Sequence, residues 1–246
     1  MHKKILIPVF VLAFTVLACA LNPAATVAPT NVPPVVQPTQ PPVVQPTLPP
    51  VLQPTASNVL FSDDFSNPNS GWEIGDYSGG SVGYGSGYYF VKTIKTSINM
   101  YGMNSMNVQD VVIEVDAAQF DAPSNNNTGY GVICRLQTGD KADEGYYFRI
   151  SGDGYYSVDV AVGGTFTSLL SGENWQAASP VIQGDSINHL VVTCNGTYLK
   201  FEVNGVTMYS GNDSTFSSGN IGLMGATYED NSTAEFHYTN FVASQP

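Results

Sequence analysis

The feature that most constrains this fold is an alternation of apolar and polar residues in short runs after residue 58. In VVIEVDAAQF, Val111, Ile113 and Val115 alternate with Glu114 and Asp116. Side chains alternate faces along a β-strand, so the pattern predicts strands with one face in the core and one polar face. No helical period of convincing length occurs. Short runs of this kind, separated by Gly, Asn, Asp and Ser, are typical of a β-sandwich or barrel.

The sequence predicts nine strands and two tight turns. The turns are Gly152-Asp153-Gly154, between two alternating runs, and the Asn204-Gly205 pair, which type I′ hairpins favour. The strands are expected at residues 88–92, 111–120, 130–137, 146–151, 155–162, 189–194, 198–203, 220–226 and 234–242.

The first residues predict export. A basic start at His2, Lys3 and Lys4 precedes an uncharged, mostly apolar run that has the length of a secretory signal and is too short for a membrane span. The run ends in VLAC, which resembles the lipobox of bacterial lipoproteins. This resemblance implies that residues 1–18 are removed and that Cys19 is acylated, which would anchor the chain to the bacterial membrane with its domain outside the cytoplasm. The alternative is a plain signal peptide with an accidental cysteine.

Residues 19–57 are expected to form a disordered, extended proline-rich linker. No charged residue occurs from 21 to 57, and an eight-residue unit recurs from Pro33, Pro41 and Pro49. Dense proline removes backbone donors and fixes φ, so the segment cannot build a packed core. The remaining residues, 58–246, are long enough for one all-β domain.

The charge balance excludes some partners. Without Lys3 and Lys4 the chain has six basic residues against twenty acidic ones. Nucleic acid and anionic lipid both require a basic surface, so neither is an expected partner of the domain.

Several segments resemble the concanavalin A-like lectin and glucanase jelly rolls. They are FSDDFSNPNSGW, GYYFRISGDGYYSV, HLVVTCNGTYLKFEVNGV, GNIGLMGA and EFHYTNFV. They are similar in particular to the laminin-G-like and 3-keto-disaccharide-hydrolase-like modules of exported bacterial proteins. The resemblance implies two antiparallel sheets of about six strands each in a jelly-roll sandwich, with ligands on the concave sheet or at its rim loops.

The polar phase of the central strands supplies candidate ligand-binding residues. If consecutive strands are neighbours, these residues share one face. Arginine can donate to hydroxyl or carboxylate groups, and tyrosine offers a ring face to a sugar. The alternative is a structural face of cross-strand ion pairs. The candidates are Glu114, Asp116, Arg135, Tyr147, Arg149 and Tyr155.

The run at residues 111–120 also contains the candidate catalytic residues. The glucanase resemblance implies a Glu-x-Asp-x-Glu or Glu-x-Asp-x-x-Glu motif, of which Glu114 and Asp116 match the first two positions. The third position is Ala118 or Gln119, and neither can act as an acid or a base. We therefore predict no catalytic residues, with a pair formed by Glu114 and Asp116 alone as the alternative.

Metal and aromatic features add little. His189 and His237 have no metal-ligand spacing, so no metal site is predicted and each histidine is expected to be structural. Some members of the fold bind Ca²⁺ at rim loops, which is an alternative for the loop acids. Trp72 is expected to cover the core or, alternatively, to stack on a sugar. The loop acids in question are Asp140, Asp143, Glu144 and Asp153.

Cys134 and Cys194 both fall in the apolar phase of predicted strands. An exported chain can form a disulfide between them, and two buried thiols are equally compatible with the pattern.

The sequence as a whole predicts an envelope-anchored lipoprotein that displays a non-catalytic β-sandwich binding a carbohydrate or another envelope or matrix component. The alternatives are a glycoside-active enzyme of the β-glucanase or 3-keto-disaccharide-hydrolase kind and a structural or protein-adhesive module. The sequence leaves the ligand and the oligomeric state open.

Overall fold

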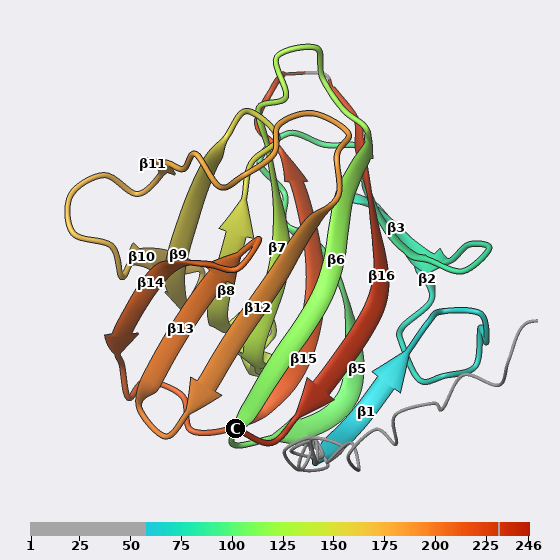
Figure 1. Cartoon of the computed structure of the whole chain (residues 1–246). Coiled ribbons are helices and arrows are strands. Elements are labelled where there is room, and N and C mark those ends of the chain that lie inside the picture. The colour runs from blue at the N-terminus through green and yellow to red at the C-terminus, as the bar shows by residue number, and fades with distance from the viewer. Residues whose placement is uncertain (1–57, 231) are drawn as a thin grey trace, which may run out of the picture. The chain divides into compact units, whose positions relative to one another are not determined.

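The computed structural model describes residues 58–230 and 232–246, which form two antiparallel β-sheets (Figure 1). The predicted all-β jelly-roll class is therefore confirmed. The predicted signal peptide and the whole proline-rich linker, residues 19–57 with Cys19, lie outside the described residues. Among the described residues, no helix is long and apolar enough to cross a membrane.

Sheet A has nine strands and sheet B has seven. The order in sheet A is β14-β13-β12-β6-β16-β4-β3-β2, with β1 paired to β16, and the order in sheet B is β10-β9-β8-β7-β15-β5, with β11 paired to β9. The strands of sheet A are β1 (Val59–Asp63), β2 (Gly75–Tyr77), β3 (Gly80–Tyr84), β4 (Tyr89–Thr93), β6 (Val111–Asp121), β12 (Asn188–Asn195), β13 (Tyr198–Val203), β14 (Val206–Asn212) and β16 (Ala234–Ser244). Those of sheet B are β5 (Met100–Val108), β7 (Thr128–Leu136), β8 (Gly145–Ile150), β9 (Tyr155–Val162), β10 (Thr165–Ser168), β11 (Gln176–Ala177) and β15 (Gly219–Thr227).

All nine predicted strands are present, and both predicted turns are confirmed. The segment Gly152-Asp153-Gly154 joins the antiparallel strands β8 and β9. Asn204 and Gly205 have φ of 51° and 80° between β13 and β14, and positive φ at both positions is what a type I′ turn requires.

The core lies between the sheets and contains the predicted apolar phase. Val111, Ile113 and Val115 of β6 are fully buried and belong to this core. Tyr238 of β16 links the two sheets, because its hydroxyl donates to the Met224 carbonyl at 2.5 Å and accepts from the Gly131 amide at 3.0 Å. A phenol buried among apolar residues needs such partners, so Tyr238 fixes how sheet A sits on sheet B.

The expectation that consecutive central strands are neighbours is wrong for β6 and β7. Strand β6 pairs with β12 and β16 in sheet A, whereas β7 pairs with β8 and β15 in sheet B. The chain crosses from one sheet to the other between these two strands. Glu114 and Asp116 therefore lie on the outer face of sheet A, and the candidates on β8 and β9 lie in sheet B.

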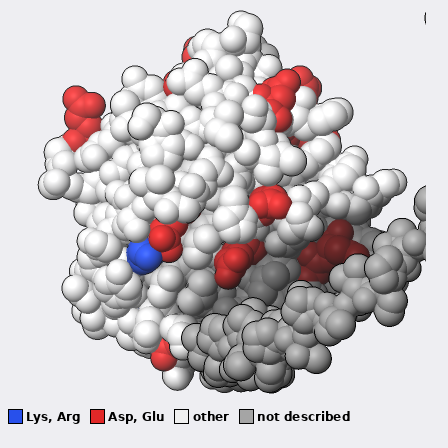
Figure 2. All heavy atoms as spheres, viewed as in Figure 1, with Lys and Arg blue, Asp and Glu red and all other residues white. Residues whose placement is uncertain are grey.

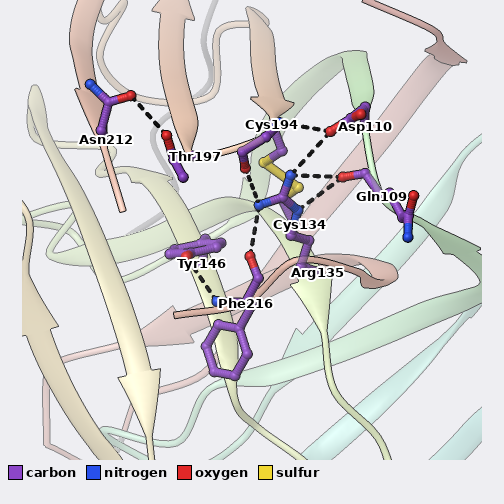
Figure 3. Close-up of polar contacts among 10 residues, drawn as sticks. Gln109, Asp110, Cys134, Arg135, Tyr146, Cys194, Thr197, Asn212 and Phe216 are labelled. Atoms are coloured by element: carbon purple, nitrogen blue, oxygen red, sulfur yellow. Dashed lines mark hydrogen bonds and ion pairs between the residues drawn. A yellow bond between two sulfur atoms is a disulfide. The ribbon is translucent and has the colours of Figure 1, made fainter. Parts of the chain in front are cut away.

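Cys134 of β7 and Cys194 of β12 form a disulfide between the two sheets (Figure 3). Both residues are fully buried. Of the two alternatives that the sequence left open, the structure contains the bridge, which closes a loop of 60 residues.

Arg135 joins three loops at the same end of the sandwich (Figure 3). Its guanidinium donates to the carbonyls of Gln109, Gly196 and Phe216 at 2.7 to 3.0 Å, and its side chain is fully buried. Gln109 precedes β6, Gly196 follows β12, and Phe216 precedes β15. With its donors directed at backbone carbonyls, Arg135 stabilises this end of the fold and is not available to a ligand.

A β-bulge explains why strand parity misplaced Arg135. The register between β15 and β7 shifts between Asn220 and Gly222, and Arg135 has φ of 55°. An extra residue in a strand reverses the alternation beyond it, so Arg135 turns toward the loops and the disulfide while Leu136 takes the outer face.

Candidate functional site

The outer face of sheet B is buried, although its side chains belong to a cluster separate from the core between the sheets. Every residue of β7, β8 and β15 is buried, whereas burial alternates along β6 and β12 in sheet A. A second apolar cluster lies on this outer face. Its buried members are Ile133, Leu136, Tyr147, Ala161, Met224 and Ala226, with Tyr101, Met103 and Tyr228 packed against them.

Arg149 of β8 lies at the centre of this face and has an unusually complete set of partners. Its Nη2 donates to Asp159 Oδ2 at 2.7 Å, its Nε to Ser157 Oγ at 3.0 Å and its Nη1 to Tyr228 Oη at 3.1 Å. The side chain is only 8% exposed. A buried charge requires such pairing, so Arg149 and Asp159 form a fixed, internally neutral pair.

Aromatic rings cover Arg149 from outside. The guanidinium carbon lies 5.0 Å from the centroid of the Trp175 ring and 5.4 Å from that of Phe166, within the range of cation–π attraction. Trp175 also packs edge-on against Tyr228, with centroids 5.9 Å apart. Arg149 thus holds both Trp175 and Tyr228, one by a ring contact and the other by a hydrogen bond.

Gly129 allows Tyr228 to lie close to the sheet. A Cβ atom at position 129 would stand 2.6 Å from the Tyr228 hydroxyl, which is closer than real side chains approach. A larger residue at this position would force the tyrosine hydroxyl to move away from β7. The placement of Tyr228 is therefore encoded in the backbone of β7 as well as in Arg149.

A hollow of about 210 Å³, which we call the Trp175 hollow, opens beside these rings. Two of its walls are the half-buried rings of Trp175 and Tyr228. Hydroxyl, amide and carboxylate groups complete it, and none of the lining side chains is basic. The lining residues are Asn127, Thr128, Ser151, Asp153, Tyr155, Trp175 and Tyr228.

Polar groups of the hollow are held in place by hydrogen bonds to one another and to the neighbouring Glu229. Ser151 Oγ donates to Asp153 Oδ1 at 2.5 Å. Asn127 Nδ2 donates to Glu229 Oε1 at 2.9 Å, and hydrogen bonds from Asn127 and Asn125 lower the pKa of the Glu229 carboxyl. The rim therefore presents ordered donors and acceptors beside the two rings.

The predicted site residues divide among three places. Tyr155 lines the Trp175 hollow and is 41% exposed, and Arg149 supports the hollow from beneath. Tyr147 is on the same sheet face but fully buried, with its hydroxyl donating to the Asp143 carbonyl. The sequence reasoning missed Trp175 and Tyr228. One of only two tryptophans, standing in a Ser, Gly and Asn loop, was the available signal.

Glu114 and Asp116 lie on the opposite side of the molecule, on the outer face of sheet A. His189 Nδ1 is 2.8 Å from Asp116 Oδ1, His189 Nε2 is 3.8 Å from Glu114 Oε2, and Asn240 donates to Asp116 at 2.8 Å. The structural alternative of ion pairs with arginine is therefore wrong for these two acids. Sheet A lies in front in Figure 1, and the same view in space-filling form shows acidic groups scattered over this face and few basic ones (Figure 2).

Among the described residues, the Trp175 hollow does not assemble a glycosidase pair. A retaining enzyme needs two carboxyl groups about 5 to 5.5 Å apart with divided roles. Asp159 is bound to Arg149, and Asp153 is the only carboxylate that lines the Trp175 hollow. The geometry of the hollow suits binding better than acid and base catalysis.

In the described part of the chain, no group of three or more His, Cys, Asp or Glu side chains is arranged to hold a metal ion. Ca²⁺ is also bound by backbone and amide carbonyl oxygens, which do not belong to such groups. The Ca²⁺ alternative therefore stays a prediction. Trp72 is 4% exposed and packs against Phe65, Tyr89 and Phe241, so the core interpretation of that residue is confirmed.

No protein-family model and no curated protein sequence matches the chain. Solved structures do match. The Bacillus licheniformis β-glucanase superposes with a TM-score of 0.57 at 13% identity, covering 78% of this chain and 99% of that one. The chain has the concanavalin A-like jelly-roll fold. A Bacillus subtilis protein of unknown function with a galectin-like fold superposes with a TM-score of 0.55 at 13% identity, covering 76% of this chain and 96% of that one. The carbohydrate-binding module CBM66 from Bacillus subtilis superposes with a TM-score of 0.52 at 16% identity, covering 71% of this chain and 96% of that one.

Proposed function

We propose that this chain is a non-catalytic, exported binding module that takes a neutral carbohydrate into the Trp175 hollow. The observation that carries the proposal is the combination of two ordered rings with a rim of hydroxyl, amide and carboxylate groups. A sugar ring has apolar C–H faces and polar edges, so it matches stacking surfaces flanked by hydrogen-bonding groups. The structural neighbours include a carbohydrate-binding module and a β-glucanase, which supports this class of ligand.

The charges favour a neutral sugar over an acidic one. The charge of Arg149 is neutralised by Asp159, and the lining of the hollow contains Asp153 but no basic side chain. Binding a sialic or uronic acid would bring a second carboxylate next to Asp153 without a cation to offset it. The net charge of −12 adds to this repulsion.

Anchoring at the cell surface belongs to the same proposal. The apolar start of the chain and the VLAC segment support export and acylation at Cys19, and the proline-rich segment supports a spacer between membrane and domain. Metabolic labelling with a fatty-acid analogue tests the anchor, because label should be lost in Cys19→Ala and kept in Cys134→Ala.

The binding proposal is tested on a glycan array that carries neutral and sialylated or uronic-acid glycans. We expect selective binding of neutral glycans by the purified chain, and a loss of at least tenfold in affinity in Trp175→Ala. Phe120→Ala is the matched control, because Phe120 is a 66% exposed aromatic residue that stacks on His237 of sheet A and does not line the hollow. Silence across all glycans, or equal losses in the two variants, would contradict the proposal.

A further inference from the structure

A second hollow, of about 330 Å³, lies at the β5 edge of sheet B, and it shares no lining residue with the Trp175 hollow. We call it the β5 hollow. Its lining combines tyrosine rings, aliphatic and thioether groups and two carboxylates, and it contains no Lys, Arg or His. The residues that matter here are Glu73, Tyr77, Ile98, Tyr101, Met103 and Asp143.

Both carboxylates of the hollow act on one phenol. Burial raises the pKa of Tyr101, and the neighbouring carboxylates of Asp143 and Glu73 raise it further. Tyr77 donates its hydroxyl to Glu73 Oε1, and this hydrogen bond is the main reason that the pKa of Tyr77 rises to about 12. Two negative charges and two neutral phenols thus converge on the same small volume.

The combination narrows the class of ligand. An anion would be repelled by Glu73 and Asp143, and a neutral sugar would gain nothing from two uncompensated charges. A small hydrated metal ion would gain nothing from Ile98 and Met103. A cation whose charge is spread over methyl groups would interact favourably with all three kinds of lining group. The carboxylates and the quadrupoles of the tyrosine rings attract its charge, and the apolar side chains contact its methyl groups.

We propose that the β5 hollow binds a small organic cation of the quaternary-ammonium class. The charge of the whole chain acts in the same direction, since a net formal charge of −12 raises the local concentration of cations around the domain. This site is independent of the carbohydrate proposal and uses none of its residues.

Choline and its neutral isostere 3,3-dimethylbutan-1-ol provide a matched pair of probes. Binding to the purified full chain is measured at neutral pH by ligand-detected NMR titration. We expect choline to bind and the alcohol to bind at least tenfold more weakly. The double variant Glu73→Gln/Asp143→Asn should lose at least tenfold in choline affinity. Gln keeps a hydrogen-bond acceptor for Tyr77, and Asn tolerates the φ of 72° at position 143, so both changes should preserve the fold.

Asp76→Asn/Asp140→Asn is the control, because it removes the same charge at exposed positions that do not line the hollow. It should change choline affinity less than twofold. Failure of choline to bind, equal binding of the alcohol, or an equal loss in both double variants would overturn the proposal, the last by assigning the effect to overall charge. Increasing salt should weaken choline binding and leave that of the alcohol unchanged.

Discussion

The outer faces of the two sheets are built from similar strands but differ in how far their charged pairs are exposed to water. On sheet A, Asp116 and His189 meet at 2.8 Å while the His189 side chain remains 44% exposed. On sheet B, Arg149 and Asp159 meet at 2.7 Å with side chains 8% and 4% exposed. The distances are alike, but the surroundings are not. Water screens the first pair, whereas the second is held beneath aromatic rings.

The difference arises from what is attached to each face. Strand β10 carries Phe166 and the loop after it carries Trp175 over Arg149, and Tyr228 follows β15 onto the same surface. Within residues 58–230 and 232–246, no comparable cover lies over β6 and β12 of sheet A, whose outward side chains stay partly exposed. A buried polar pair can therefore hold a ligand wall in position, while an exposed pair mainly keeps its face soluble.

Breaking the buried pair should have the largest effect. Arg149→Met leaves Asp159 as an unpaired buried carboxylate and removes the support of Trp175 and Tyr228. We expect a loss of about 3 to 5 kcal/mol in the free energy of unfolding, measured by urea denaturation. Adding Asp159→Leu to this variant should recover much of the stability without restoring sugar binding. If Arg149→Met alone lost less than about 1 kcal/mol in the free energy of unfolding, the pair would not be buried as described.

Opening the disulfide tests the link between the two sheets. Cys134–Cys194 closes a 60-residue loop, for which the chain-entropy model predicts about 4 kcal/mol of stabilisation. Urea unfolding with and without reductant should differ by roughly this amount in the parent chain. Cys134→Ala/Cys194→Ala should not respond to reductant. Equal unfolding curves for the oxidised and reduced parent chain would argue against the bridge.

Removing the exposed pair should matter much less. Asp116→Asn on sheet A is expected to cost less than about 1 kcal/mol, because both partners contact water. Sugar binding should be unchanged, since Asp116 is in the other sheet. Glu114→Gln tests the enzymatic alternative. Glycan hydrolysis by the parent chain that is absent from this variant would favour an active site on sheet A.

The smallest effect concerns the rim of the Trp175 hollow. Hydrogen bonds from Asn127 and Asn125 hold the pKa of Glu229 below its ordinary 4.5. A carboxyl with a lowered folded-state pKa stabilises the fold above its unfolded pKa and loses this contribution as the pH falls through the folded value. Melting temperatures compared at pH 7 and at about pH 3 should therefore fall less in Glu229→Gln than in the parent chain. Parallel pH profiles would contradict this assignment.

The sequence predicted more of the fold than of the candidate site. The alternation in β6 identified its core residues, and the Gly152-Asp153-Gly154 and Asn204-Gly205 turns located two hairpins. Among the candidate site residues, Tyr155 lies in the Trp175 hollow and Arg149 lies beneath it. Arg135 was misplaced by a bulge, and Trp175 was missed because it stands in a loop without periodicity.

The sequence by itself determined which side of the central strands faces the core, except beyond the bulge in β7, because the side-chain period and the conformational preference of Asn-Gly turns are local properties of the chain. Only the tertiary structure decided which strands are neighbours, and so placed Glu114 and Arg149 in different sheets. Strand pairing joins residues as distant as Glu114 and Val242, and its free energy depends on packing between whole sheets. The candidate site exists only where that packing brings Arg149, Trp175 and Tyr228 together.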